Sequence, residues 1–285
     1  MTRKRISLKR LVTNVPALIG LLLVLLAVGS AVFAAHLAPH DPVAAELRLR
    51  LDPPGWDPAS KAKYLLGADA VGRDMLTRII YGSRISLMIG IASTAISMVL
   101  GVTLGLLSGY FGGWIESIVM RVADVQLAFP FILLALVIMA IFGGGLTKLI
   151  LILGLTGWVS YARLVRSQVL SVRELDFVQA ARSLGAKDLG IIWRHILPNV
   201  ISSVIVLSTL QVATNILTEA GLTFLGLGVD PSIPSWGGML ADGRNYITNA
   251  WWVATFPGFA IMLTVLGVNL LGDWLRDELD PQLRV

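Results

Sequence analysis

Six long stretches of this 285-residue chain carry few or no charged side chains, and they limit the possible folds more than any other feature. A run of about 18 or more apolar residues is long enough to cross a bilayer as an α-helix. Only 14% of the residues are charged, against about 25% in soluble domains. The sequence therefore predicts an all-α polytopic membrane protein with six transmembrane helices. The runs are Pro16 to Ala35, Ile85 to Ile115, Val125 to Thr147, Leu149 to Ala162, Val200 to Ser232 and Ala250 to Gly272.

The fourth run is too short to span by itself. Its length from Leu149 to Ala162 gives about 21 Å of helix, against a hydrocarbon core of about 30 Å. We expect this helix to extend past Arg163 or to begin within the segment GGGLTK at 143–148. In the second run, Gly101, Gly105 and Gly109 lie four residues apart, a spacing that favours close packing of another helix.

Basic residues indicate how the chain crosses the membrane. If both termini are cytoplasmic, the inner segments hold 14 of the 23 lysines and arginines, as the positive-inside rule favours. Most of the others lie in one outer loop, 36–84, together with six acidic residues. The basic start of the chain and the length of the first run, which is long for the core of a signal peptide, predict an uncleaved signal anchor. The net charge of +5 reflects the inner loops and not nucleic-acid binding.

This topology divides the chain into three parts. Residues 1–84 hold the cytoplasmic N-terminus, the first helix and the outer loop, and residues 85–274 form a five-helix core with a cytoplasmic loop at 163–199. Residues 275–285 are a cytoplasmic tail.

The composition argues against chemistry on this chain. There is no cysteine, and the three histidines have no metal-ligand spacing, so we expect no metal site. No G-x-x-x-x-G-K-[ST] motif is present, because GGGLTK has the wrong spacing for a phosphate-binding loop. We therefore expect no catalytic residues and no cofactor on the chain.

The loop at 163–199 is the longest polar segment between two apolar runs. The stretch SVRELDFVQAARSL predicts a helix that ends at Gly185. A second helix, AKDLGIIWRHI, places four apolar residues on one face, and Pro198 is expected to stop it before the fifth span. Two such helices either dock on a partner protein or lie on the membrane surface, and the pattern alone leaves both open.

Several stretches resemble the permease subunits of ABC importers. Gln179-Ala180-Ala181, Gly185 and Leu197-Pro198 have the spacing of the EAA motif, although Gln179 replaces the usual Glu and His195 the usual Ile. The segments LLGADAVGRDMLTRIIYGSRISL, RVADVQLAFP, GLTFLGLGVDPSIPSWGGML and NLLGDWLRDELDPQLR are also similar. Together they resemble the dipeptide/oligopeptide/nickel permease group, in the subtype with a longer loop after the first helix.

The resemblance implies a type I ABC importer transmembrane domain in the bacterial cytoplasmic membrane. It implies a second, homologous permease, two ATPase subunits that bind ATP and Mg²⁺, and an extracytoplasmic substrate-binding protein. Peptides, or modified peptides such as glutathione, are the expected substrates, with a nickel chelate as the alternative. The residues expected to couple the chain to an ATPase are Gln179, Ala180, Ala181, Gly185, Leu189 and Pro198.

Candidates for the translocation path are fewer. Glu219 is an ionisable residue inside a predicted span, which by default indicates function. Asp124, Gln126 and Asn215 are further candidates, with Gln211 nearby. The alternative class is a self-contained ion-coupled transporter, which needs several buried ionisable groups and often internal repeats. Glu219 alone, without an evident repeat, counts against that class.

Overall fold

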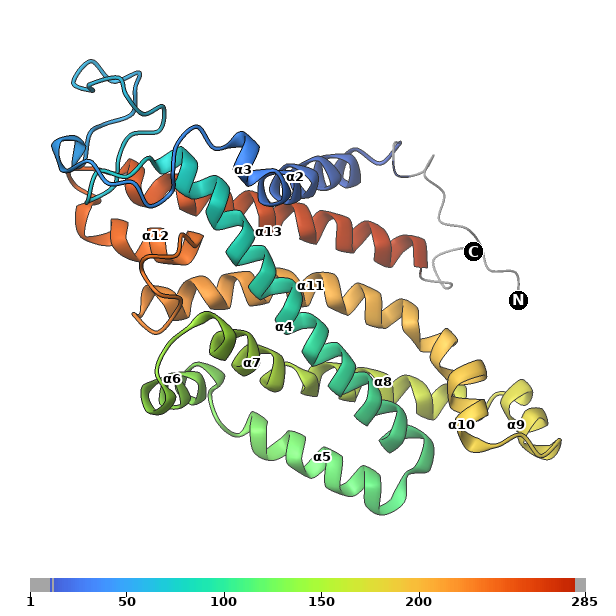
Figure 1. Cartoon of the computed structure of the whole chain (residues 1–285). Helices are drawn as coiled ribbons and strands as arrows, with labels where there is room; N and C mark the ends of the chain where they lie inside the picture. The colour runs from blue at the N-terminus through green and yellow to red at the C-terminus, as the bar shows by residue number, and fades with distance from the viewer. Residues whose placement is uncertain (1–10, 12, 280–285) are drawn as a thin grey trace.

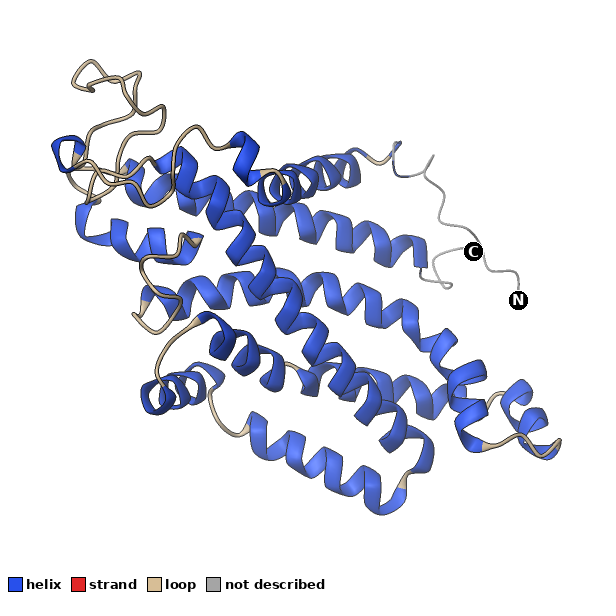
Figure 2. Cartoon of the chain, viewed as in Figure 1, coloured by secondary structure: helices blue, strands red, loops and turns tan. Residues whose placement is uncertain are grey.

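A computed structural model describes residue 11 and residues 13–279 of the chain. In that part the fold is helical, and the only extended pairing is an isolated bridge between Ala68 and Asp74 (Figure 2). The helices are α2 (Val15–Val32), α3 (Ala34–Leu37), η1 (Leu47–Leu49), α4 (Met75–Phe111), α5 (Gly113–Leu127), α6 (Phe131–Phe142), α7 (Leu146–Thr156), α8 (Trp158–Val172), α9 (Asp176–Ser183), α10 (Asp188–Ile191), η2 (Ile192–Ile196), α11 (Leu197–Phe224), α12 (Trp236–Gly243), η3 (Arg244–Tyr246) and α13 (Trp252–Leu279).

Within the described residues, five helices are long and apolar enough to cross a membrane, and a bent pair makes up to six. The five are α2, α4, α7 with α8, α10 with α11, and α13, and the pair is α5 with α6. This confirms the predicted class, and the predicted number of six is reached when the bent pair counts as one span. Figure 1 shows the start of α2, the end of α13 and the α9–α10 segment at one end of the molecule. A topology with both termini and this segment in the cytoplasm requires that arrangement, and it stays a prediction.

Helix α4 begins ten residues before the predicted second span. Asp74 caps it, because the Asp74 carboxylate accepts hydrogen bonds from the backbone N–H groups of Leu76 at 3.2 Å and Thr77 at 3.3 Å. The first turns also carry Arg78, which is buried, with its Nε 3.5 Å from Asp69. A pairing from a separate loop thus allows a charged residue inside the helix, and the predicted start at Ile85 is wrong.

The predicted third span is broken. Helix α5 ends at Leu127 and α6 begins at Phe131, with an angle of 84° between them. Pro130 immediately precedes α6, where its missing N–H costs nothing and its ring prevents α5 from continuing. The predicted third span, Val125 to Thr147, is therefore not one continuous helix.

The predicted fourth span is extended at both ends. It runs from Leu146, inside GGGLTK, to Val172, well past Arg163, so both expected extensions are present.

Helix α4 runs through the centre of the molecule and packs against α2, α7, α8 and α11 (Figure 1). Its glycines set the approach of α8. A Cβ added at Gly105 would lie 2.8 Å from the carbonyl oxygen of Ala162 and from Cβ of Val165, and one at Gly109 would lie 2.7 Å from Cβ of Val169. The predicted close contact at this four-residue spacing is confirmed.

Pro198 does not stop the second short helix of the 163–199 loop. Helix α10 continues through the π-helical turn η2 into α11, and Asp188–Phe224 qualifies as one 37-residue span. Pro198 lies in the first turn of α11, and the wider turn before it accommodates a residue that cannot donate a backbone hydrogen bond. The last part of the loop, from Asp188, and the fifth span are therefore one continuous helical element.

The outer loop folds over one end of the bundle. Arg73 Nε donates to Asp69 Oδ2 at 2.6 Å, and Trp252 Nε1, at the start of α13, donates to the carbonyl of Ala68 at 3.1 Å. The second contact is buried and joins the segment before α4 to the start of α13.

Candidate functional site

The α9–α10 segment comprises residues 176–191, and its first helix, α9, ends with a defined cap. Gly185 has φ +80°, its N–H donates to Arg182 at 3.0 Å, and the N–H of Ala186 donates to Ala181 at 3.1 Å. These two bonds form a Schellman motif, in which glycine occupies the left-handed position. The cap explains the glycine at position 185, whereas Ala181 contributes only its backbone carbonyl. The predicted helix end at Gly185 is confirmed, but the predicted helix is not continuous from Ser171, because a turn at 173–175 separates α8 from α9.

Gln179 holds α9 against the end of α8. Its Nε2 donates to the carbonyl of Arg173 at 3.0 Å and lies 3.5 Å from Oε2 of Glu174. Arg173 in turn donates to the carbonyl of Gly109 at 2.8 Å. Gln179 therefore replaces the family's usual Glu with an amide whose hydrogen bonds remain inside the segment.

The segment is fixed to the spans by residues that the sequence did not single out. Tyr110, at the end of α4, donates to Asp188 Oδ1 at 2.6 Å, and the Arg182 guanidinium lies 5.5 Å from the Tyr110 ring centroid. Val178 and Ile191 are fully buried in one cluster with residues of α4, α8 and α11. Motion of α9 and α10 must therefore involve these three helices.

The apolar face predicted for the second helix is divided. Ile192 and Ile196 are buried, while Leu189 is 64% and Trp193 63% exposed. Leu184, beside the glycine turn, is 87% exposed. Three large apolar side chains thus face outward at the end of a polar segment, and we name Leu184, Leu189 and Trp193 the tip surface. Of the other coupling candidates, Ala180 and Pro198 are exposed and Gln179 and Ala181 half-buried.

Two of the four path candidates share a cavity. Gln126 and Asn215 line a space of ≈ 260 Å³ bounded by α5 to α8 and α11, together with Gln211. Gln126 accepts from Trp158 Nε1 at 2.8 Å and donates to the carbonyl of Thr156 at 2.6 Å. The lining is neutral and rich in amide and hydroxyl groups, which suits hydrogen bonding to uncharged polar groups. Asn215 also donates to the hydroxyls of Ser93 and Thr94 on α4.

The two carboxylates lie elsewhere. Asp124 pairs with Arg163 at 2.5 Å and lines a separate groove of ≈ 780 Å³ between α5 and α8. Glu219 is fully buried, and its carboxylate accepts from Thr223 at 3.0 Å and from Ser86 at 3.3 Å. Ser86 also accepts from the backbone N–H of Trp236 in α12. In this structure Glu219 therefore joins α4, α11 and α12, away from the cavity.

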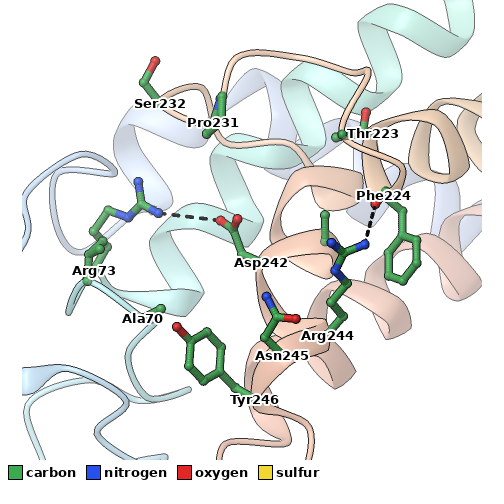
Figure 3. A pocket seen from close by; sticks show the side chains of 13 residues that line it. Ala70, Arg73, Thr223, Phe224, Pro231, Ser232, Asp242, Arg244, Asn245 and Tyr246 are labelled. Carbon is green, nitrogen blue, oxygen red and sulfur yellow. Dashed lines mark hydrogen bonds and ion pairs between the residues drawn. The ribbon is translucent and has the colours of Figure 1, made fainter. Parts of the chain in front are cut away.

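A further pocket lies at the opposite end of the molecule from the tip surface. It has a volume of ≈ 550 Å³ and is lined by residues from the segment before α4, the end of α11 with its following loop, and the α12–η3 stretch (Figure 3). Charged side chains at its wall are Arg73, Asp242 and Arg244. No sequence motif indicated it, because three distant segments build it. We name it the outer pocket.

Comparison with known proteins gives the family. Residues 101–285 match the family described as "Binding-protein-dependent transport system inner membrane component". The chain belongs to this family. Residues 2–54 also match the N-terminal transmembrane domain of oligopeptide transport permease C. The chain is thus an inner membrane component of an ABC importer, as the resemblance implied.

Named relatives cover almost the whole chain. A di/tripeptide transport system permease protein of Pseudomonas aeruginosa is 45% identical over 95% of this chain and 89% of its own length. A glutathione transport system permease protein of Pectobacterium atrosepticum is 45% identical over 92% of this chain and 86% of its own. A chain of the MetNI methionine ABC transporter, solved in inward-facing conformations, has a TM-score of 0.57 at 19% identity, covering 72% of this chain and 97% of that one. The last likeness concerns the fold alone.

Proposed function

We propose that this chain forms half of a membrane pathway for short peptides, di- and tripeptides or peptides such as glutathione. The two relatives named for such substrates match it at 45% identity over nearly its full length, which supports this class over a nickel chelate. Its partners in the proposal are a second permease, two ATPases that bind ATP and Mg²⁺, and an extracytoplasmic binding protein.

The cavity supports a path for peptides. Amide groups of Gln126 and Gln211 and hydroxyl groups of Thr214 and Thr218 line this cavity and can exchange hydrogen bonds with a peptide backbone as it passes. A neutral lining holds no substrate charge tightly, which favours release over retention. In the proposal Asp124 and Glu219 position helices and do not contact the peptide.

One observation carries the coupling role: the tip surface is exposed, while the residues directly beneath it are buried among three spans. Large apolar side chains at the end of a rigid segment are suited to a groove on a partner protein. An ATPase that grips the tip surface moves α10, and α10 is continuous with α11. The coupling residues, Gly185 and Gln179 among them, keep the segment rigid enough to transmit the motion.

A matched pair of substitutions tests the docking. Leu189→Asp places a charge on the tip surface, and Leu47→Asp does the same in the outer loop, where Leu47 is 74% exposed. The tagged chain is purified in mild detergent and co-purified ATPase is measured by mass spectrometry. We expect ATPase to be lost only with Leu189→Asp. If both variants retain the ATPase equally, Leu189 does not dock on it. The α9–α10 segment is then better explained as an element that lies on the membrane surface.

Reconstitution tests the transport class. Proteoliposomes that contain the purified assembly should import a labelled dipeptide only with ATP inside and the binding protein outside. Import that proceeds without ATP but follows an ion gradient would support the secondary-transporter class instead.

A further inference from the structure

The outer pocket holds an anion and a cation that the described part of the chain leaves poorly compensated. Asp242 Oδ2 lies 3.9 Å from Arg73 Nη2, and the Asp242 carboxylate forms no hydrogen bond within the described residues. Arg73 is already engaged, because its Nε donates to Asp69 at 2.6 Å. Burial raises the pKa of the Asp242 carboxyl, and Arg78 and Arg73 only partly oppose this. Asp242 thus has one ion-pair partner in the part of the chain that the structure describes, at the limit of ion-pairing distance, and its side chain is 42% exposed, so a ligand can reach it.

Arg244 is the complementary case. Its Nη1 donates to the carbonyl of Phe224 at 3.2 Å, and its guanidinium lies over the Phe224 ring, 5.3 Å from the centroid. Among residues 13–279 no carboxylate lies within ion-pairing distance of Arg244. A guanidinium stacked on an aromatic ring is held in place with most of its donors free. Arg244 is thus positioned to receive a carboxylate.

The two groups share one wall of the pocket. Asp242 and Arg244 are two residues apart at the end of α12 and the start of η3, and Figure 3 shows Asp242 directed toward Arg73 and Arg244 directed toward the carbonyl of Phe224. The volume of ≈ 550 Å³ is within the range of small-molecule sites, about 300–1,000 Å³. Ala70, Val71 and Pro231 give the pocket an apolar part.

From this geometry we infer that the outer pocket binds a small zwitterion, an amino acid or short peptide with free ends, whose ammonium group meets Asp242 and whose carboxylate meets Arg244. Arg244 and Arg73 attract a carboxylate, and Asp242 attracts an ammonium group. A ligand that carries both charges complements both kinds of residue.

This site is separate from the cavity proposed as the transport path. The cavity uses Thr218 on α11 and the outer pocket uses Phe224, and six residues at 3.6 per turn place these on different sides of the helix. The inference therefore goes beyond the proposed function. A ligand here would bridge the segment before α4, the end of α11 and α12. It would favour the arrangement of these three segments seen in this structure.

Direct binding tests the inference. The full chain is purified with the subunits that stay associated, without the soluble binding protein, and equilibrium binding of labelled alanyl-alanine is measured. Arg244→Gln and Asp242→Asn should each weaken binding roughly 10-fold, as loss of one charge-assisted interaction predicts. Arg48→Gln, an exposed outer arginine outside the pocket, is the matched control and should leave the affinity unchanged.

Modified ligands assign each end. Alanyl-alanine amide should bind the wild type about as weakly as free dipeptide binds Arg244→Gln, with no further loss when both changes are combined. N-acetyl-alanyl-alanine should bind the wild type about as weakly as free dipeptide binds Asp242→Asn, again with no further loss when both changes are combined. Alanine and trialanine compare ligand lengths. A photoreactive dipeptide should label residues 241–246 or 70–73.

Three results would overturn the inference: no saturable dipeptide binding, labelling confined to the cavity on α5 and α11, or Arg244→Gln weakening only the docking of the binding protein. The last would mean that the pocket receives an acidic side chain of that protein. If the assembly imports peptides but the pocket binds no dipeptide, this inference is wrong and the proposed function stands. If the pocket binds dipeptide but the assembly imports no peptide, the proposed function is wrong and this inference stands.

Discussion

The glycine turn of the α9–α10 segment gives the sharpest quantitative prediction. Gly185 has φ +80°, and a Cβ there would meet nothing within 4 Å, so a substitution acts through the backbone and not through a clash. An L-residue in the left-handed region costs about 1–2 kcal/mol. For Gly185→Ala we therefore expect the opening equilibrium of the turn to rise roughly 5- to 30-fold.

Hydrogen exchange measures this opening directly. The N–H groups of residues 185 and 186 donate to Arg182 and Ala181, so both exchange only when the turn opens. Exchange in the assembled importer should quicken by the same roughly 5- to 30-fold in Gly185→Ala. Gly185→Asn should lie between, because Asn tolerates the left-handed region better than Ala.

Gly190 supplies the control. It lies in the helical α10 of the same segment, also has open space at its Cβ, and has no positive φ. Gly190→Ala should leave exchange at 185 and 186 unchanged. Equal exchange in Gly185→Ala and the wild type would refute the reasoning, as would an equal acceleration by Gly190→Ala.

Three other perturbations follow from the structure. Gly105→Leu should lower the melting temperature of the purified chain, since overpacking costs about 1–3 kcal/mol, whereas Gly29→Ala, with open space at its Cβ, should not. Glu219→Leu should destabilise the chain by about 1–3 kcal/mol by leaving two buried hydroxyls without their acceptor, and Glu219→Gln should cost less in the same melting assay. Burial raises the pKa of the Asp242 carboxyl above 3.8, so the folded chain binds that proton more tightly than the unfolded chain does. The stability that this group contributes therefore falls as the pH rises from 3.8 through the raised pKa. Asp242→Asn should remove that part of the pH dependence of the melting temperature.

Features set by local sequence were predictable. Apolar runs gave the spans because a bilayer admits few alternatives to a helix. Glycine spacing gave the close contact of α4 with α8, and Gly185 gave the end of α9, since each depends on a missing Cβ.

Features that depend on distant partners were not predictable. The start of α4 includes Arg78 only because Asp69, from the preceding loop, lies beside it. Pro198 continues a helix because a π-helical turn precedes it, which no propensity reveals. The sequence indicated the candidate polar residues but not which of them line the cavity. Gln126 and Asn215 line it and Glu219 does not, because this depends on which helices meet.

The continuity of α10, η2 and α11 makes this element a lever. Thirty-seven residues at 1.5 Å each give a rod about 55 Å long. A tilt of roughly 10° about its midpoint would move each end by about 5 Å, in opposite directions, because half the rod is about 27 Å. A small push on Leu189 at one end would thus displace Phe224 at the other, where it forms a wall of the outer pocket. In the proposed coupling, this continuous helix connects Leu189 with Phe224 directly, and no chain of contacts between separate helices is required.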